Sequence, residues 1–135
     1  MSETLNLTKE LIAKESVTPN DAGCQELVAE RLKKLGFKIK NLKFGEVDNL
    51  WATLGDSGPL FTFLGHTDVV PAGPLEDWDS NPFIQTESGN LLVGRGAADM
   101  KGSVAAFVTS IEAFLEKKSK FDGRIAVLLT SDEEG

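Results

Sequence analysis

The sequence predicts an α/β fold, in which helices pack against a central sheet. Apolar residues recur at the helical period in residues 3–15, 24–35 and 104–115, and short apolar runs between them indicate strands. The run 125–129 holds five apolar residues in succession, which is typical of a strand buried on both faces. Helices that precede, separate and flank strands are the pattern of an α/β domain.

Composition excludes several classes of protein. The 135 residues suit one domain, and 41% of them are hydrophobic. The net charge of −7 argues against nucleic-acid binding, and no apolar run is long enough to cross a membrane. The start of the chain lacks the pattern of a signal peptide. A single cysteine, Cys24, excludes an internal disulfide, so we expect a cytoplasmic protein.

Three helices are expected, each with its own boundary signals. The first covers residues 3–15 and ends at a break over 16–21, where Asn20 or Asp21 can cap the second helix. Gly36 is expected to end that second helix in the left-handed conformation. Ser103 is expected to cap the third.

Five strands are expected between and after these helices. They cover residues 37–40, 49–54, 60–64, 91–93 and 125–129. Prolines and glycines concentrate in residues 71–90, which we expect to form one long loop, and such loops are often functional.

Chemically versatile side chains follow three of the expected strands. His66 and Asp68 follow the strand 60–64, Asp99 follows 91–93, and the acidic run 132–134 follows 125–129. Ligands of open α/β sheets bind outside the carboxyl ends of strands. The sequence therefore predicts a site where these three ends meet.

His66 is the only histidine, and the nearby Asp68 strengthens the case that His66 binds a metal ion. A spacing of two puts both side chains on one side of an extended segment. A carboxylate there can fix the orientation of a metal-binding imidazole. The alternative is a structural histidine, with Asp68 forming a turn before Pro71.

Asp99 lies in a glycine-rich stretch just before the third helix. A phosphate-binding loop is rejected, because the stretch Gly94–Asp99 lacks the third glycine of the dinucleotide pattern, and Lys101–Ser103 has the wrong order for a phosphate loop. The remaining alternatives are a metal-binding carboxylate and a simple helix-entry aspartate.

Glu133 and Glu134 are adjacent, so in an extended segment they would point in opposite directions. Two unpaired buried carboxylates would repel each other. A divalent cation would remove that penalty for one of them, and the other could act as a general base. The alternative is a solvated acidic turn.

Several stretches of the chain carry a family resemblance. They are Ser16–Asp21, Asn49–Ala52, Gly65–Pro71, Trp78 with Pro82–Phe83, Gly94–Gly102 and Ser131–Glu134. Together they resemble the M20 peptidase family of metal-dependent amidohydrolases. The resemblance covers the whole chain and implies a three-layer sandwich, with a mixed sheet flanked by helices.

The resemblance implies a metal-binding role for three residues. His66 matches a histidine that binds one zinc ion, and Asp68 matches the aspartate that orients it. Asp99 matches a carboxylate that bridges two zinc ions, often followed by a cis peptide, here Asp99–Met100. Glu134 matches a ligand of the second zinc, and cobalt can substitute for zinc in such sites.

The resemblance also implies a reaction. Glu133 matches the general base that activates water for attack on an amide. Residues 97–98 and the N-terminal stretches favour members that hydrolyse N-succinyl-LL-2,6-diaminopimelate, a small-molecule substrate, to succinate and LL-2,6-diaminopimelate in lysine biosynthesis. The alternatives are an acetylornithine deacetylase, an aminoacylase or a peptidase of the family, and a short non-enzymatic metal-binding protein.

Members of the family are longer than this chain and place further zinc ligands and a dimerisation domain beyond residue 135. Residues 1–135 are therefore expected to be the N-terminal portion of the catalytic domain, inactive alone. A homodimer is expected for the full-length family.

Overall fold

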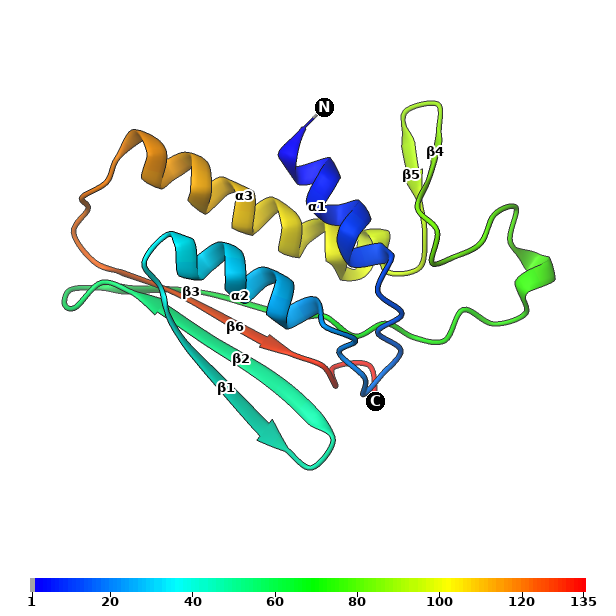
Figure 1. Cartoon of the computed structure of the whole chain (residues 1–135), viewed down its shortest axis with the longest axis horizontal. Coiled ribbons are helices and arrows are strands. Elements are labelled where there is room, and N and C mark those ends of the chain that lie inside the picture. The colour runs from blue at the N-terminus through cyan, green and yellow to red at the C-terminus, as the bar shows by residue number, and fades with distance from the viewer. Residues whose placement is uncertain (1) are drawn as a thin grey trace.

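A computed structural model describes residues 2–135 (Figure 1). Its main helices are α1 (Glu3–Ile12), α2 (Cys24–Lys34) and α3 (Gly102–Lys117). Its strands are β1 (Lys38–Phe44), β2 (Val47–Leu54), β3 (Leu60–His66), β4 (Thr86–Ser88), β5 (Leu91–Val93) and β6 (Arg124–Thr130). Two short helical turns, η1 (Leu75–Asp77) and η2 (Ala97–Lys101), complete the described elements.

Four strands form a mixed sheet in the order β1-β2-β6-β3. β6 pairs antiparallel with β2 and parallel with β3, so it occupies the interior of the sheet. Its Ala126, Val127 and Leu129 are buried, as the apolar run predicts. The α/β fold with a mixed sheet is thereby confirmed.

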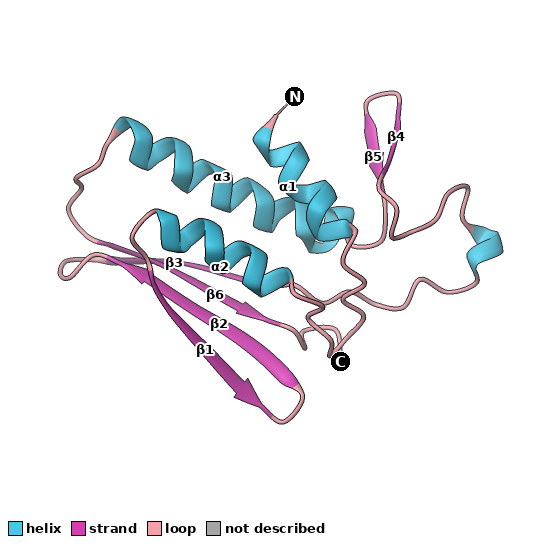
Figure 2. Ribbon diagram, viewed as in Figure 1, coloured by secondary structure: helices cyan, strands magenta, loops and turns pink. Residues whose placement is uncertain are grey.

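The helices α1, α2 and α3 lie on one side of this sheet (Figure 2). Within residues 2–135 the molecule is therefore a helical layer on a sheet, and the described elements supply no second helical layer for the expected sandwich. The opposite face carries exposed apolar side chains, including Leu64, which is 67% exposed.

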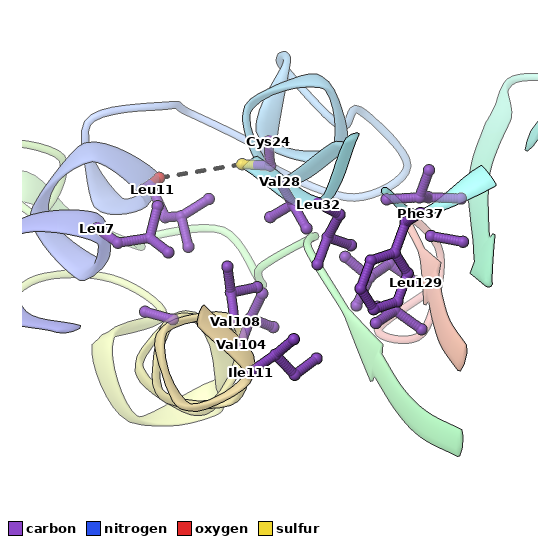
Figure 3. Close-up of a cluster of buried hydrophobic side chains, with 14 residues drawn as sticks. Leu7, Leu11, Cys24, Val28, Leu32, Phe37, Val104, Val108, Ile111 and Leu129 are labelled. Atoms are coloured by element: carbon purple, nitrogen blue, oxygen red, sulfur yellow. Dashed lines mark hydrogen bonds between the residues drawn. The ribbon is translucent and has the colours of Figure 1, made fainter. Parts of the chain in front are cut away.

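The core fills the space between the helices and the sheet (Figure 3). Leu11 of α1, Val28 of α2 and Val108 of α3 meet there, beside Leu129 of β6. Cys24 also lies in this core, and burial raises the pKa of its thiol. The apolar stripes of the three helices thus converge on one cluster, as their periodicity predicts.

One of the two expected boundaries of α2 is wrong in position, because Gly23 occupies the N-cap and neither Asn20 nor Asp21 does. Of the two candidate caps, Asp21 is the one whose carboxylate accepts hydrogen bonds from the main-chain N–H groups of Gly23 (3.1 Å) and Gln25 (3.0 Å). Asn20 instead accepts from Ala22. Gly36 has a φ of 95°, which confirms the left-handed residue after the helix.

Two expectations about the region before α3 are wrong. Ser103 does not cap α3, because the helix is entered directly from η2 through Lys101 and Ser103 already lies in the first turn. Residues 71–90 are not all loop, because Thr86–Ser88 form β4 and pair with β5 in a small hairpin. The prolines in this region fall outside that hairpin, which is why it can form.

None of the helices in the described part of the chain has both the length and the apolar character needed to span a bilayer.

Candidate metal centre

The carboxyl ends of β3 and β6 lie side by side, and they position the site. The two strands are parallel, and His66 at the end of β3 is in register with Thr130 at the end of β6. The residues that follow each strand therefore enter the same space. In Figure 1 the red end of the chain lies beside the blue segment that joins α1 to α2, where the hydroxyl of Ser131 donates to the main-chain carbonyl of Pro19 at 2.7 Å.

His66 is buried, and its two ring nitrogens have different partners. Nδ1 lies 2.9 Å from the main-chain carbonyl of Asp68, and since a carbonyl only accepts, Nδ1 must donate. Nε2 faces the acidic groups, 3.0 Å from Asp99 Oδ1 and 3.7 Å from Glu133 Oε2. With Nδ1 engaged, Nε2 is the nitrogen left for a metal ion.

The surroundings of His66 act on its pKa in opposite directions. Burial alone favours the neutral ring and would lower the pKa. The hydrogen bonds to the carbonyl of Asp68 and the carboxylate of Asp99, with the charges of Asp68 and Glu133, outweigh burial and raise the pKa above its ordinary value. The acidic groups therefore attract positive charge to Nε2.

Glu133 and Glu134 both reach the same place as His66. One potential ligand atom from each of the three residues lies within 4.8 Å of the other two. The expectation that the two glutamates point in opposite directions assumed an extended strand, but residues 131–135 form no regular element. Leaving the strand allows two adjacent carboxylates to approach one imidazole.

Asp99 is brought to His66 by the irregular turn η2. Its φ and ψ of −126° and 94° are not helical, and the Asp99–Met100 peptide is cis, as the family resemblance implies. Gly96 allows this turn to pack against the segment that follows β3, because its φ is 79° and an added Cβ would clash with Val69 Cγ1. The Asp99 side chain remains 76% exposed, so it is accessible to a ligand from solvent.

Asp68 lies fully buried beneath these residues. Its carboxylate is 3.5 Å from His66 Nδ1, whereas the main-chain N–H groups of Glu133 and Glu134 donate to it at 3.2 and 3.1 Å. The closer contact of Asp68 to His66 is made by its main-chain carbonyl. The carboxylate therefore bonds mainly to the acidic segment.

Sequence reasoning assigned no site role to Thr18. Its hydroxyl donates to Asp68 Oδ2 at 2.5 Å, although the two residues are fifty positions apart. The segment Ser16–Asp21 was interpreted as a break between helices and as part of the family resemblance. The only sequence signal for Thr18 was a hydroxyl residue placed before a proline. No spacing rule connects such a residue with Asp68.

The donor set fits a divalent transition metal. An imidazole nitrogen and carboxylate oxygens are the ligands that zinc accepts, and cobalt accepts the same set. His66 Nε2, Asp99 and the two glutamates supply one nitrogen and several oxygens within a small volume. A pocket lined by Gly55–Gly58 and Phe121 opens at the opposite end of β3 and β6, and it contains none of these residues.

A family model matches more than half of the chain. Residues 62–135, which include every predicted site residue, match the model described as peptidase family M20/M25/M40. The match begins in β3 and runs through β6 and the acidic segment.

Several proteins similar to the chain over its whole length are succinyl-diaminopimelate desuccinylases. The succinyl-diaminopimelate desuccinylases of Methylobacillus flagellatus and Stenotrophomonas maltophilia are 57% and 59% identical over all 135 residues. The chain spans 36% of the length of each of these relatives.

Solved structures share the fold. Human carnosine dipeptidase 1 matches 94% of the chain with a TM-score of 0.84 and 27% identity, and the chain covers 31% of that protein. An M20 family metallo-carboxypeptidase from Sulfolobus solfataricus matches 96% of the chain with a TM-score of 0.83 and 25% identity, and the chain covers 30% of it.

Proposed function

Because the chain belongs to peptidase family M20/M25/M40, we propose that it supplies part of the active site of a succinyl-diaminopimelate desuccinylase. That enzyme would hydrolyse the amide of N-succinyl-LL-2,6-diaminopimelate to succinate and LL-2,6-diaminopimelate. The gathering of His66, Glu133 and Glu134 within 4.8 Å carries the proposal of a hydrolytic metal site. Identities of 57% and 59% over the whole chain support this substrate.

The proposed metal ligands are His66, Asp99 and Glu134. His66 would bind through Nε2, because Nδ1 is engaged with the main chain. Asp99, with two oxygens and a mostly exposed side chain, suits a bridge between two zinc ions. When bound, such ions polarise the scissile carbonyl and make water a stronger acid.

Glu133 is proposed as the general base. Its carboxylate lies beside the ring of His66 and is 57% exposed, so water reaches it. It would take a proton from the attacking water and pass that proton to the leaving amine. The water oxygen would end in the new carboxylate of succinate, and the carbon–nitrogen bond would break.

Counting the proposed ligands leaves each ion short of protein partners. His66 and Asp99 would hold one ion, and Asp99 and Glu134 the other. Catalytic zinc commonly has three protein ligands and a water. We therefore expect no appreciable hydrolase activity from these 135 residues alone, and robust zinc-dependent turnover of the succinylated substrate by them would contradict this ligand count.

The affinity of the chain for zinc tests the proposed site directly. The purified chain should bind zinc, and Asp99→Ala should weaken that binding by at least about tenfold, because a ligand is lost. Asp56→Ala is the matched control, since Asp56 is exposed in the turn between β2 and β3. Isothermal titration with zinc measures all three proteins. Equal affinity in wild type and Asp99→Ala would remove Asp99 from the proposed site.

The second candidate function is a peptidase of the same family, favoured by the fold similarity to a dipeptidase and a carboxypeptidase. A substrate panel on the complete gene product separates the two. A desuccinylase should prefer the succinylated diamine, whereas a preference for dipeptides or for acetylated amino acids would contradict the proposed substrate.

A further inference from the structure

The buried carboxylate of Asp68 is the point where three separate segments meet. Its Oδ1 accepts the main-chain N–H of Glu133 at 3.2 Å, and its Oδ2 accepts that of Glu134 at 3.1 Å. Oδ2 also accepts the hydroxyl of Thr18 at 2.5 Å. A fully buried carboxylate is stable only when such donors surround it.

We propose that Thr18 is a positioning residue, which acts through Asp68 to hold the main chain of Glu133 and Glu134 in place. The importance of that place rests on the proposed function, in which Glu133 is the base and Glu134 a metal ligand. The holding itself is a property of the described hydrogen bonds. In the acidic segment, residues 132–134, the hydrogen bonds to Asp68 take the place of the main-chain bonds that a strand would make.

The acidic segment needs this support because it has left the sheet. Beyond Thr130 the chain forms no regular element, so the N–H groups of Glu133 and Glu134 have no ladder partners. Hydrogen bonds from amides to a carboxylate are about twice as strong as those between neutral groups. The two bonds to Asp68 fix two consecutive peptide units. They therefore restrict the positions of the Cα atoms of Glu133 and Glu134.

Thr18 can perform this task because its own segment is held on two sides. Its N–H donates to the carbonyl of Val69 at 3.1 Å, and the N–H of Val69 donates to the carbonyl of Ser16 at 2.8 Å. The hydroxyl of Ser131 donates to the carbonyl of Pro19 at 2.7 Å. The segment is therefore tied both to the end of β3 and to the end of β6.

One hydroxyl hydrogen serves one acceptor at a time, which identifies the acceptor that matters. Thr18 Oγ1 is also 3.3 Å from Asp132 Oδ1 and 3.4 Å from the carbonyl of Ser131. Asp68 Oδ2 is much closer and is buried, so it takes the hydrogen. Without this donor, Asp68 would keep only its two amides and the more distant ring of His66.

The proposal predicts distinct behaviour for two substitutions of Thr18. Thr18→Val keeps the shape and removes the hydroxyl, whereas Thr18→Ser keeps the hydroxyl. In the metal-free chain, Thr18→Val should speed hydrogen exchange of the Glu133 and Glu134 amides about tenfold, since roughly one net hydrogen bond is lost. Thr18→Ser should leave both rates within about twofold of wild type.

Thr109→Val is the matched control. Thr109 also makes side-chain hydrogen bonds in a partly buried place, to Thr4 and to the carbonyl of Ala105, but it lies in α3 away from the acidic segment. It should leave the exchange of both glutamate amides unchanged. Amide-resolved NMR exchange measures this in each variant, and circular dichroism verifies folding. If Thr18→Val fails to fold, Thr18→Ala takes its place.

Zinc affinity provides the second readout. Thr18→Val should lower it about tenfold, the usual effect of removing a group that orients a ligand, and Thr18→Ser should not. Equal amide exchange in wild type, Thr18→Val and Thr18→Ser would overturn the proposal. Faster exchange in Thr18→Val alone, in a chain that binds no zinc, would uphold the positioning and contradict the metal site.

Discussion

His66 illustrates how one residue acquires its properties from partners that are distant in sequence. Burial by itself would keep its ring neutral, as in many structural histidines. The carbonyl of Asp68 and the carboxylates of Asp99 and Glu133 reverse that effect. The same acidic groups that raise its pKa are the ones proposed to surround a metal ion, so protons and metal ions compete for Nε2.

The stability of the metal-free chain should depend on pH through His66. Its pKa is raised in the folded state, so the folded chain binds the proton more tightly than the unfolded chain does. The resulting stabilisation is fully present below the unfolded pKa of about 6.5 and is lost as the pH rises through the folded pKa. Urea unfolding of the chelator-treated chain across this range should show the free energy of unfolding falling with pH.

His66→Gln provides the control for this pH dependence, because glutamine does not titrate. The variant should lose most of the slope between about pH 6 and 8, where carboxylates remain ionised. Parallel curves for the wild type and the variant would show that other groups govern stability in that range.

At the scale of elements, Lys101 joins η2 to α1. It is 1% exposed, and its ammonium donates to the carbonyls of Leu11 at 2.7 Å and Lys14 at 2.8 Å. These carbonyls lie at the C-terminal end of α1, where helices leave acceptors unpaired and favour a cation. The turn that carries Asp99 is thereby fixed to the first helix, although burial lowers the pKa of Lys101.

Lys101→Met should destabilise the chain by about 1–3 kcal/mol, because it removes the two hydrogen bonds that the buried ammonium donates to the carbonyls of Leu11 and Lys14. Lys117→Met, at the exposed last turn of α3, should change the free energy of unfolding by less than about 0.5 kcal/mol. Urea denaturation compares the two variants with the wild type. Equal free energies of unfolding for Lys101→Met and the wild type would contradict a stabilising role of the ammonium.

At the scale of the whole molecule, the sheet has one covered face and one open face. The helices bury Leu50 and Leu129 on the first face. On the other face, Leu64 of the edge strand β3 pairs with Leu128 of β6 and remains mostly exposed. An apolar surface of this kind favours association, since it lies beside the edge of β3 that pairs with no other strand in residues 2–135.

The 135-residue chain should therefore self-associate as its concentration rises, and Leu64→Ser should weaken that association about tenfold or more. Leu91→Ser is the matched control, because Leu91 is similarly exposed but lies on β5, outside the main sheet. Sedimentation velocity at several concentrations distinguishes them. If both substitutions weaken association equally, or if neither does, the open face of the sheet around Leu64 is not the contact surface.

The sequence correctly predicted the helices and strands that bury one or both faces. Its predictions for the irregular segments were less accurate. The stripes of α1, α2 and α3 and the apolar run of β6 were found because burial imposes a period on the residues. The predicted cap of α3 was wrong, because the irregular turn η2 runs directly into the helix. The hairpin strand β4 was missed, since its three residues carry no clear period.

The sequence by itself determined that His66 and Glu133–Glu134 follow strands of an α/β sheet, because residue types and spacing suffice for that. The expectation that Asp99 follows a strand of the same sheet was wrong, because β5 pairs with β4 in a separate two-stranded sheet. Only the tertiary structure decided how these residues meet. The parallel pairing of β3 with β6 aligns two strand ends, and η2 brings in Asp99. The link from Thr18 through Asp68 to the glutamate amides joins three distant segments, and such contacts depend on folding, which no local pattern encodes.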